Sequence, residues 1–263
     1  MGRSVVVGAG HMGSVVAGRL ADELPGAEVA VVEPSADRRA ALGRDPRLRV
    51  RESYRPEPGD TVVLAIPPAA LDAFAAGLPA EAFRTATVVS VMAGVRLASL
   101  AARLGTPHVL RAMPNLAAEA GQSMTLLCPG PGARPEDLER AERVLSAIGA
   151  YLVVPDESLL DAGTALVGSG PALVAYLAKA FADFAVEAGF GPADALRMTC
   201  QVLRGTADLL AAGDGGPERL YRRAATPGGT TEQGISCLAD HRVQDALHEA
   251  LARTAARSRE LAG

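Results

Sequence analysis

The sequence predicts an α/β fold, with an N-terminal doubly wound parallel sheet followed by an all-α domain. Three observations lead to this prediction. Short runs of Val, Leu and Ile alternate with helical patterns in the first half of the chain, a glycine-rich loop directly follows the first run, and such runs stop after about residue 155. Strands that are apolar throughout are buried on both faces, and their alternation with helices favours a parallel sheet.

The elements of the first half are expected in alternating order. Apolar runs predict strands at residues 4–7, 28–32, 61–66, 87–91, 109–111, 124–127 and 151–153. Helical spacing predicts helices at residues 12–24, 36–42, 97–104 and 135–148, and Pro67-Pro68 begins another. Together they make a predicted domain of residues 1–155.

The second half, residues 156–263, is predicted to be a helical domain. Helices are expected at 157–167, 171–188, 192–212, 230–238 and 241–261, separated by Gly and Pro. The helix at 172–188 is apolar on most faces, so protein must surround it. Because the other helices of one chain are too few to cover it, we expect an obligate subunit interface.

Composition argues against several partners. The chain has 26 basic and 30 acidic residues and a net charge of −4, so no basic surface for nucleic acid is expected. The longest uncharged central stretch, residues 162–178, contains three glycines and a proline and is too short and broken to span a membrane. The three cysteines match neither a disulfide framework nor a metal site. We expect a cytoplasmic protein without nucleic-acid or membrane partners.

The sequence Gly8-Ala9-Gly10-His11-Met12-Gly13 lies between the first strand and the first helix. In this context it predicts a Rossmann-type dinucleotide site. The first glycine permits a tight turn, the second lets the backbone approach the pyrophosphate, and the third lets the helix pack on the strand. His11 and Met12 are assigned to this loop without a catalytic role.

Residues after the second strand bear on the choice between NADH and NADPH. Glu33 lies 20 residues after Gly13, where a carboxylate accepts from the ribose hydroxyls and repels a 2′-phosphate. Ser35, Arg38 and Arg39 follow and are suited to a 2′-phosphate, unless the arginines form only a solvated helix face. Both cofactors therefore stay open.

Loops after later strands should flank the nicotinamide, since ligands of doubly wound sheets lie at the carboxyl ends of the strands. One loop contains Met92, Ala93 and Gly94. Another ends in Asn115, whose amide either contacts the cofactor or only caps a turn. Ala65 and Pro67 complete the expected cofactor site.

The segment that precedes the helix at 230–238 is a candidate substrate loop. Backbone N–H groups and threonine hydroxyls there would form a neutral nest for a small carboxylate. The candidate binding residues are Thr226, Gly228, Gly229, Thr230 and Thr231. A plain helix cap is the alternative.

In order and spacing, these motifs resemble the pyrroline-5-carboxylate reductase family over almost the whole chain. The matching motifs are GAGHMG at 8–13, VVSVMAGV at 88–95, RAMPN at 111–115, GSGPA at 168–172 and PGGTT at 227–231. The resemblance implies a Rossmann domain, a helical dimerisation domain, and reduction of a cyclic imine to proline with NADPH or NADH. It also implies a homodimer, often assembled further into a decamer, with the substrate between the PGGTT loop and the cofactor and completed by partner helices.

Three positions depart from the family pattern. Leu116-Ala117 follows Asn115 where the family has Thr-Pro, Thr226 replaces Ser, and Ile66 replaces Lys. These departures leave the fold prediction unchanged but leave the exact imine and the cofactor preference open.

The expected chemistry needs little from the protein, because a protonated imine is already an electrophile. The site must hold the imine carbon about 3–3.5 Å from nicotinamide C4. Thr231 is the expected catalytic residue, and it would orient the imine or relay a proton through water, since its hydroxyl is a poor acid.

Three alternatives stand beside this interpretation. They are a reductase of a related cyclic imino acid, an oxidoreductase like the β-hydroxyacid dehydrogenases, and an idle NAD(P)H sensor. The second carries a lysine in a Gly-x-x-x-Lys-x-x-x-Asn helix, whereas Val174 and Ala178 follow Gly170 here.

Overall fold

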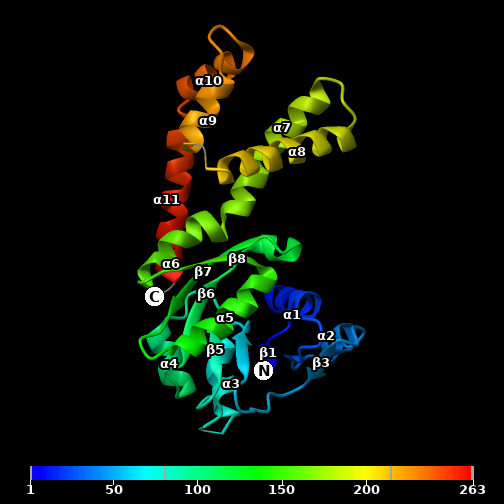
Figure 1. Cartoon of the computed structure of the whole chain (residues 1–263), viewed down its shortest axis with the longest axis vertical. Helices are drawn as coiled ribbons and strands as arrows, with labels where there is room; N and C mark the ends of the chain where they lie inside the picture. The colour runs from blue at the N-terminus through cyan, green and yellow to red at the C-terminus, as the bar shows by residue number, and fades with distance from the viewer. Residues whose placement is uncertain (1, 80, 214, 262–263) are drawn as a thin grey trace. The chain divides into compact units, whose positions relative to one another are not determined.

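An eight-stranded sheet forms the first part of the protein (Figure 1). The computed structural model describes residues 2–79, 81–213 and 215–261. The strands are β1 (Ser4–Val7), β2 (Val29–Val32), β3 (Leu48–Arg51), β4 (Thr61–Leu64), β5 (Thr87–Ser90), β6 (Val109–Met113), β7 (Ser123–Pro129) and β8 (Gly149–Val153). Their order, β3-β2-β1-β4-β5-β6-β7-β8, confirms the predicted doubly wound topology.

The direction of the strands differs from the prediction at one end of the sheet. The strands from β3 to β6 are parallel, but β7 runs antiparallel to β6, with Arg111 opposite Cys128, and β8 follows the direction of β7. A parallel pair needs a crossover of a dozen or more residues. The connection from Met113 to Ser123 is shorter, so the chain turns back and the sheet is mixed.

Helices cover both faces of the sheet and give each face its own apolar core. Helices α1 (His11–Glu23) and α5 (Pro135–Ile148) pack on one face, and α3 (Leu71–Ala76) and α4 (Leu97–Leu104) pack on the other. The remaining elements here are α2 (Ala36–Leu42), α6 (Ser158–Gly163), the 3-10 helices η1 (Pro68–Ala70) and η2 (Leu116–Ala120), and the π-helix η3 (Thr164–Gly168).

Three elements were not anticipated from the sequence. Strand β3 alternates Leu48 and Val50 with two exposed arginines, Arg49 and Arg51. Charged side chains are common on edge strands because they discourage pairing with another chain, and they hide the apolar run from sequence reasoning. The others are the 3-10 helix η2, which Asn115 caps, and a short, strongly charged helix, α9 (Gly216–Ala224).

The chain divides into two compact units. The first unit runs to Pro171 and takes in the chain from Thr254 on, and the second unit comprises residues 172–253. Helix α6 and η3 pack against β6 and β7, so the first unit extends beyond the end of the sheet near residue 155. The helices that follow are α7 (Gly170–Glu187), α8 (Pro192–Ala211), α9, α10 (Thr230–Asp240) and α11 (Val243–Leu261).

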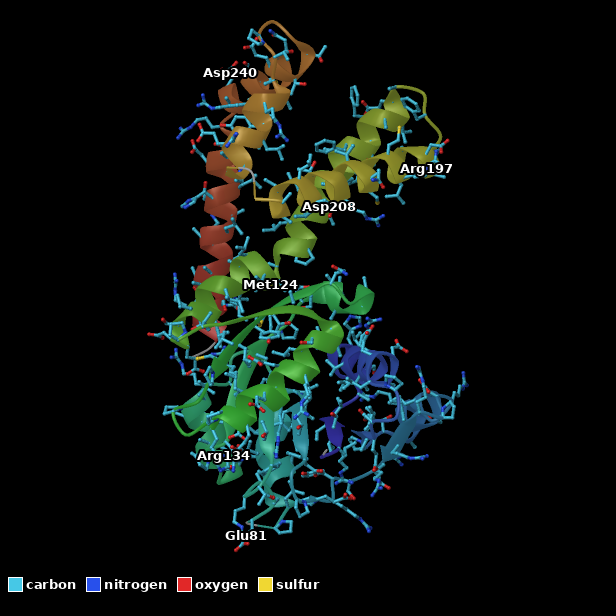
Figure 2. All side chains as sticks on the ribbon, in the orientation of Figure 1. Glu81, Met124, Arg134, Arg197, Asp208 and Asp240 are labelled. Carbon is cyan, nitrogen blue, oxygen red and sulfur yellow. The ribbon has the colours of Figure 1, made fainter. Side chains whose placement is uncertain are left out.

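Helix α7 is apolar, yet most of its side chains are uncovered by the described part of the chain. Only Ala185 is buried, whereas Tyr176 is 78% and Phe184 is 72% exposed. Charged residues such as Arg197 and Asp208 project from α8 (Figure 2). The predicted subunit interface would bury the exposed apolar side chains of α7.

The continuous helical stretch Ser158–Glu187 also has the length and composition of a membrane-spanning helix. It is not a uniform α-helix, because η3 interrupts it. A Cβ atom on Gly168 of η3 would lie 2.9 Å from Met113 Cε of β6, so this part of the stretch packs against the sheet.

Candidate functional site

The glycine loop after β1 forms a cradle. Gly8 has φ +93°, and a Cβ atom there would lie 2.8 Å from the Ala65 carbonyl oxygen. A Cβ on Gly13 would collide with the Gly8 carbonyl. A Cβ on Gly10 would meet no described atom within 4 Å. The chain itself therefore requires glycine at Gly8 and Gly13, whereas the space beside Gly10 is open.

The beginning of α1 suits an anion. Gly10 occupies the N-cap position without a side-chain cap, and the first turn has no acidic residue. The first N–H groups of a helix lack partners within the helix and carry the positive end of its dipole. His11 Nε2 lies 2.9 Å from Glu119 Oε1 of η2, with both side chains exposed, while Met12 packs partly against the core. His11 thus links α1 to η2 beside the loop.

The carboxylate of Glu33 is bound by the backbone around it. Its Oε2 accepts from Ala9 N at 2.9 Å and its Oε1 from Ser35 N at 2.8 Å, and the residue is 2% exposed. Glu33 therefore connects the glycine loop to the start of α2. A ribose hydroxyl would have to use the remaining lone pairs of the same oxygens.

The polar residues at the start of α2 divide into two groups. Ser35 caps the helix, with Oγ 3.5 Å from Arg38 N, and the Arg39 guanidinium donates to the carbonyls of Glu33 and Pro34. Arg38 is exposed, with Nε 3.5 Å from Glu33 Oε1. Of the two arginines, Arg38 is thus the one whose guanidinium is open to a phosphate.

The remaining predicted cofactor residues lie at the same edge of the sheet, since β1, β4, β5 and β6 are neighbours. Pro67 and Ala93 are exposed there and Ala65 is half-buried. Gly94 has φ +73°. Met92 packs into the core and is 4% exposed, and its N–H donates to Ser90 Oγ.

The amide of Asn115 is used within the protein. Its Oδ1 accepts from Ala117 N at 2.9 Å, which makes Asn115 the cap of η2. Its Nδ2 donates to the carbonyls of Val167 at 2.9 Å and Met124 at 3.4 Å. Asn115 therefore caps a turn, which was the alternative to a contact with the cofactor. It also holds η3 against the sheet.

A buried ion cluster was missed by sequence reasoning. The Arg111 guanidinium lies 2.9 Å from Glu157 Oε1 and 3.4 Å from Asp161 Oδ1, and Arg111 and Asp161 are each 5% exposed. Glu157 also accepts from Leu97 N. The available signal was an arginine inside an apolar strand, since a buried charge needs a partner.

The PGGTT loop leads into α10 in the second unit. Gly228 has φ +72°, Gly229 is the N-cap of α10, and Gly229 N donates to the Thr226 carbonyl at 2.9 Å. Thr226, Thr230 and Thr231 are exposed. The structure brings the five predicted substrate residues together in one exposed turn at a helix start.

Glu232 is a further residue of this loop that the sequence analysis did not single out. Its Oε2 accepts from Gly228 N at 2.6 Å. Its spacing was the available signal, because a glutamate at the third position of a helix commonly reaches back to a backbone N–H before the helix.

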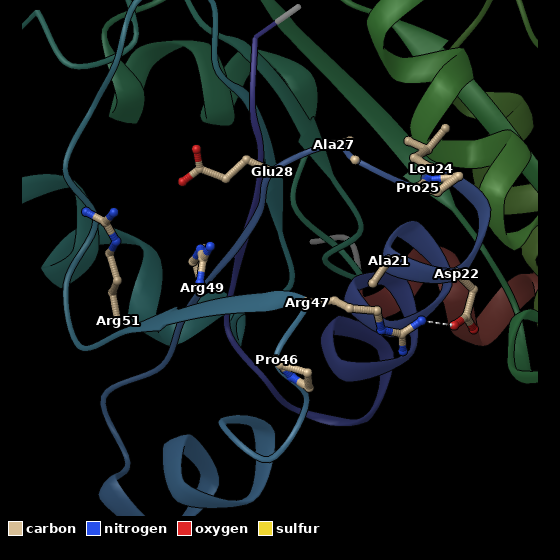
Figure 3. A pocket seen from close by; sticks show the side chains of 11 residues that line it. Ala21, Asp22, Leu24, Pro25, Ala27, Glu28, Pro46, Arg47, Arg49 and Arg51 are labelled. Atoms are coloured by element: carbon tan, nitrogen blue, oxygen red, sulfur yellow. Dashed lines mark hydrogen bonds and ion pairs between the residues drawn. The ribbon is translucent and has the colours of Figure 1, made fainter.

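A hollow of about 630 Å³ is lined by residues at the other end of the sheet (Figure 3). Arg47, Arg49 and Arg51 line it beside Glu28, and Arg47 pairs with Asp22 at 2.6 Å. Glu28 precedes β2 and Arg47 precedes β3, so the hollow lies at the amino ends of these strands. Ligands of doubly wound sheets bind at the carboxyl ends, so we assign it no part in the reaction.

Two family models match the chain. The model described as pyrroline-5-carboxylate reductase dimerisation matches residues 157–261, and the model described as NADP oxidoreductase, coenzyme F420-dependent, matches residues 3–94. The helical half is therefore similar to a known dimerisation domain, and the cofactor half is similar to a known nucleotide-dependent oxidoreductase domain.

Relatives and solved structures agree with these matches. Pyrroline-5-carboxylate reductase from Synechocystis is 34% identical over 97% of each chain, and that from Methanosarcina acetivorans is 37% identical over 97% of this chain and 96% of its own. The solved reductase from Coxiella burnetii has a TM-score of 0.90 at 24% identity, covering 99% of this chain and 98% of its own. The chain therefore belongs to the pyrroline-5-carboxylate reductase family.

Proposed function

We propose that this protein reduces 1-pyrroline-5-carboxylate to L-proline with NADPH or NADH, the last step of proline biosynthesis. The observation that carries the proposal is the glycine cradle, where the space beside Gly10 is open at the start of α1. A relative named pyrroline-5-carboxylate reductase matches 97% of this chain.

The residues at the cradle fit a dinucleotide. When bound, NAD(P)H supplies a hydride to the carbon of the C=N bond. The backbone at Gly10 and the first turn of α1 would hold the pyrophosphate, because they present N–H groups and no acidic side chain. Glu33 and Arg38 would meet the adenine ribose, and Ala93 and Gly94 would leave room for the nicotinamide.

The PGGTT loop would hold the substrate. Backbone N–H groups at the start of α10 would bind the carboxylate of the imino acid, with Thr226 and Thr230 beside them. Thr231 would hydrogen bond the ring nitrogen, so that the imine is oriented and its proton held in place. The predicted domain limits of 1–155 and 156–263 separate these two sets of residues.

The protein would act as a homodimer, and further assembly to a decamer is part of the proposal. The match to a dimerisation domain and the exposed apolar side chains of α7 support an oligomer. We place the enzyme in the cytoplasm, as the composition predicts.

A steady-state assay with purified protein tests the function. Oxidation of NADPH and of NADH is followed with 1-pyrroline-5-carboxylate and with the six-membered cyclic imino acid. Reduction of NADP⁺ and of NAD⁺ is followed with a β-hydroxy acid. We expect the highest kcat/KM with 1-pyrroline-5-carboxylate. Preference for the six-membered ring would assign a related imine reductase, alcohol oxidation would assign the dehydrogenase class, and cofactor binding without turnover would indicate a sensor.

A further inference from the structure

Glu232 places a carboxylate at the loop that is proposed to bind the substrate's carboxylate. Its Oε2 accepts from Gly228 N at 2.6 Å, and hydrogen bonds to an ionised acceptor are short and strong. Gly228 is one of the five residues of the proposed nest. The inference that follows therefore rests on the proposed function.

Two N–H groups of this loop are already used within the chain. Gly229 N is already bonded to the Thr226 carbonyl, and a Cβ on Gly229 would lie 2.5 Å from Thr226 Oγ1, so the turn is tightly closed at that point. Gly228, with φ +72°, is in the left-handed region that glycine adopts readily. Its N–H is thus a fixed donor of the turn, and the Glu232 carboxylate occupies it.

A substrate with a carboxylate meets two obstacles here. A carboxylate that uses Gly228 N has to share or displace its hydrogen bond to Glu232, and any carboxylate in the nest has to approach a side chain of the same charge. Glu232 is half-buried on the first turn of α10, so water screens it only in part. An imine without a carboxylate meets neither obstacle.

We propose that Glu232 is a specificity-determining residue that competes with the substrate's carboxylate for Gly228 N–H. It weakens the selection of carboxylate-bearing imines over uncharged cyclic imines. A glutamate that only capped α10 would stabilise the helix and leave this selection unchanged.

The test compares Glu232→Gln with the wild-type enzyme on two substrates, 1-pyrroline-5-carboxylate and unsubstituted 1-pyrroline. We expect the KM for the carboxylate-bearing imine to fall by about 5-fold, the effect of removing a like charge near the surface. The KM for 1-pyrroline and the KM for NADPH should stay unchanged. Glu249→Gln is the matched control, since it removes one negative charge from an exposed Glu249–Arg253 pair in α11.

The outcomes separate this inference from the proposed function. An unchanged or higher KM for 1-pyrroline-5-carboxylate in Glu232→Gln, with a lower Tm, would show a helix cap only and overturn the inference. An equal change for both imines would also overturn it. If wild-type protein reduces neither imine, the proposed function itself fails. Glu232→Ala, which lacks any acceptor for Gly228 N, should lower the same KM. If one of the two variants fails to fold, the other still tests the inference.

Discussion

The two compact units of the chain differ in where their apolar residues lie. In the first unit, every residue of β2, β4 and β5 is buried, and helices pack on both faces of the sheet. In the second unit, α7 has one buried residue among 18, and large apolar side chains of α7 and α8 are exposed. The first unit buries its own core, whereas the second has apolar faces that the described part of one chain does not cover.

An apolar pattern in the sequence therefore predicts that a segment is buried. It does not say whether the same chain or a partner chain covers that segment. The strands β2, β4 and β5 and the helix α7 are all mainly apolar in sequence. Monomeric proteins rarely expose large apolar patches, so the second unit needs a partner. A dimer would therefore be a condition for activity, and the four predictions below test this division of roles.

The largest effect is expected from a charge in the apolar face of α7. Phe184→Arg places a guanidinium where the proposed partner helix packs, and a symmetric dimer contains the change twice. We expect the dimer Kd to rise at least about 100-fold and activity to fall with it. Sedimentation over a range of concentrations measures this. Arg197→Ala, at an exposed polar side chain of α8, should leave the dimer intact. A stable and active wild-type monomer at micromolar concentration would contradict the proposed interface.

The next largest effect is expected in the first unit alone. Gly10→Val places a branched side chain in the open space of the cradle, where the pyrophosphate would approach the backbone. Affinity for NADPH and NADH should fall by about 100-fold, the equivalent of about 3 kcal/mol, while the dimer persists.

Fluorescence titration of the cofactor and sedimentation of the same variant check both halves of this expectation. Gly18→Val is the matched control, because Gly18 lies in α1, the helix that Gly10 caps, and a Cβ there also meets no described atom within 4 Å. If Gly10→Val binds NAD(P)H as tightly as Gly18→Val does, the cradle is not the pyrophosphate site.

A smaller effect is expected in the second unit. Thr231→Ala removes the hydroxyl proposed to orient the ring nitrogen, and a misplaced imine loses its alignment. Losing one hydrogen bond to a charged group is worth about 1.5–3 kcal/mol, so kcat with 1-pyrroline-5-carboxylate should fall by about 10- to 100-fold. Cofactor affinity should not change, since Thr231 lies outside the first unit.

Thr226→Ala serves as the comparison within the same loop, because it should act mainly on KM through a weaker hold on the carboxylate. Pre-steady-state and steady-state kinetics of the two variants separate these effects. Full activity in Thr231→Ala would indicate that the PGGTT loop acts only as a helix cap.

Sequence reasoning predicted features that depend on local geometry. The tight turn at Gly8 and the close packing at Gly13 follow from the spacing of the glycines, and the doubly wound class of the sheet follows from the alternation of strands and helices. It did not predict the antiparallel β7, because the length of the connection was not weighed. Nor did it predict that both amide hydrogens of Asn115 are used by the protein, or that Glu232 binds Gly228 N, since these contacts depend on how the chain folds back.

The smallest expected effect concerns Glu33 and the choice of cofactor. As a free carboxylate it would repel a 2′-phosphate, and Glu33→Ser should then shift preference toward NADPH. In the structure, however, Glu33 holds Ala9 N and Ser35 N, so Glu33→Ser also loosens the glycine loop and should weaken both cofactors. Glu33→Gln separates the two effects, because it removes the charge and keeps one acceptor oxygen.

We expect Glu33→Gln to raise the ratio of kcat/KM for NADPH to that for NADH by about 5-fold, the effect of one screened like charge. Arg38→Ala is the paired variant. It removes the guanidinium beside Glu33 Oε1 and should lower the same ratio. A wild-type enzyme that strongly prefers NADPH, with a ratio unchanged in Glu33→Gln, would show that Glu33 acts only by holding the loop and that Ser35 and Arg38 determine the cofactor.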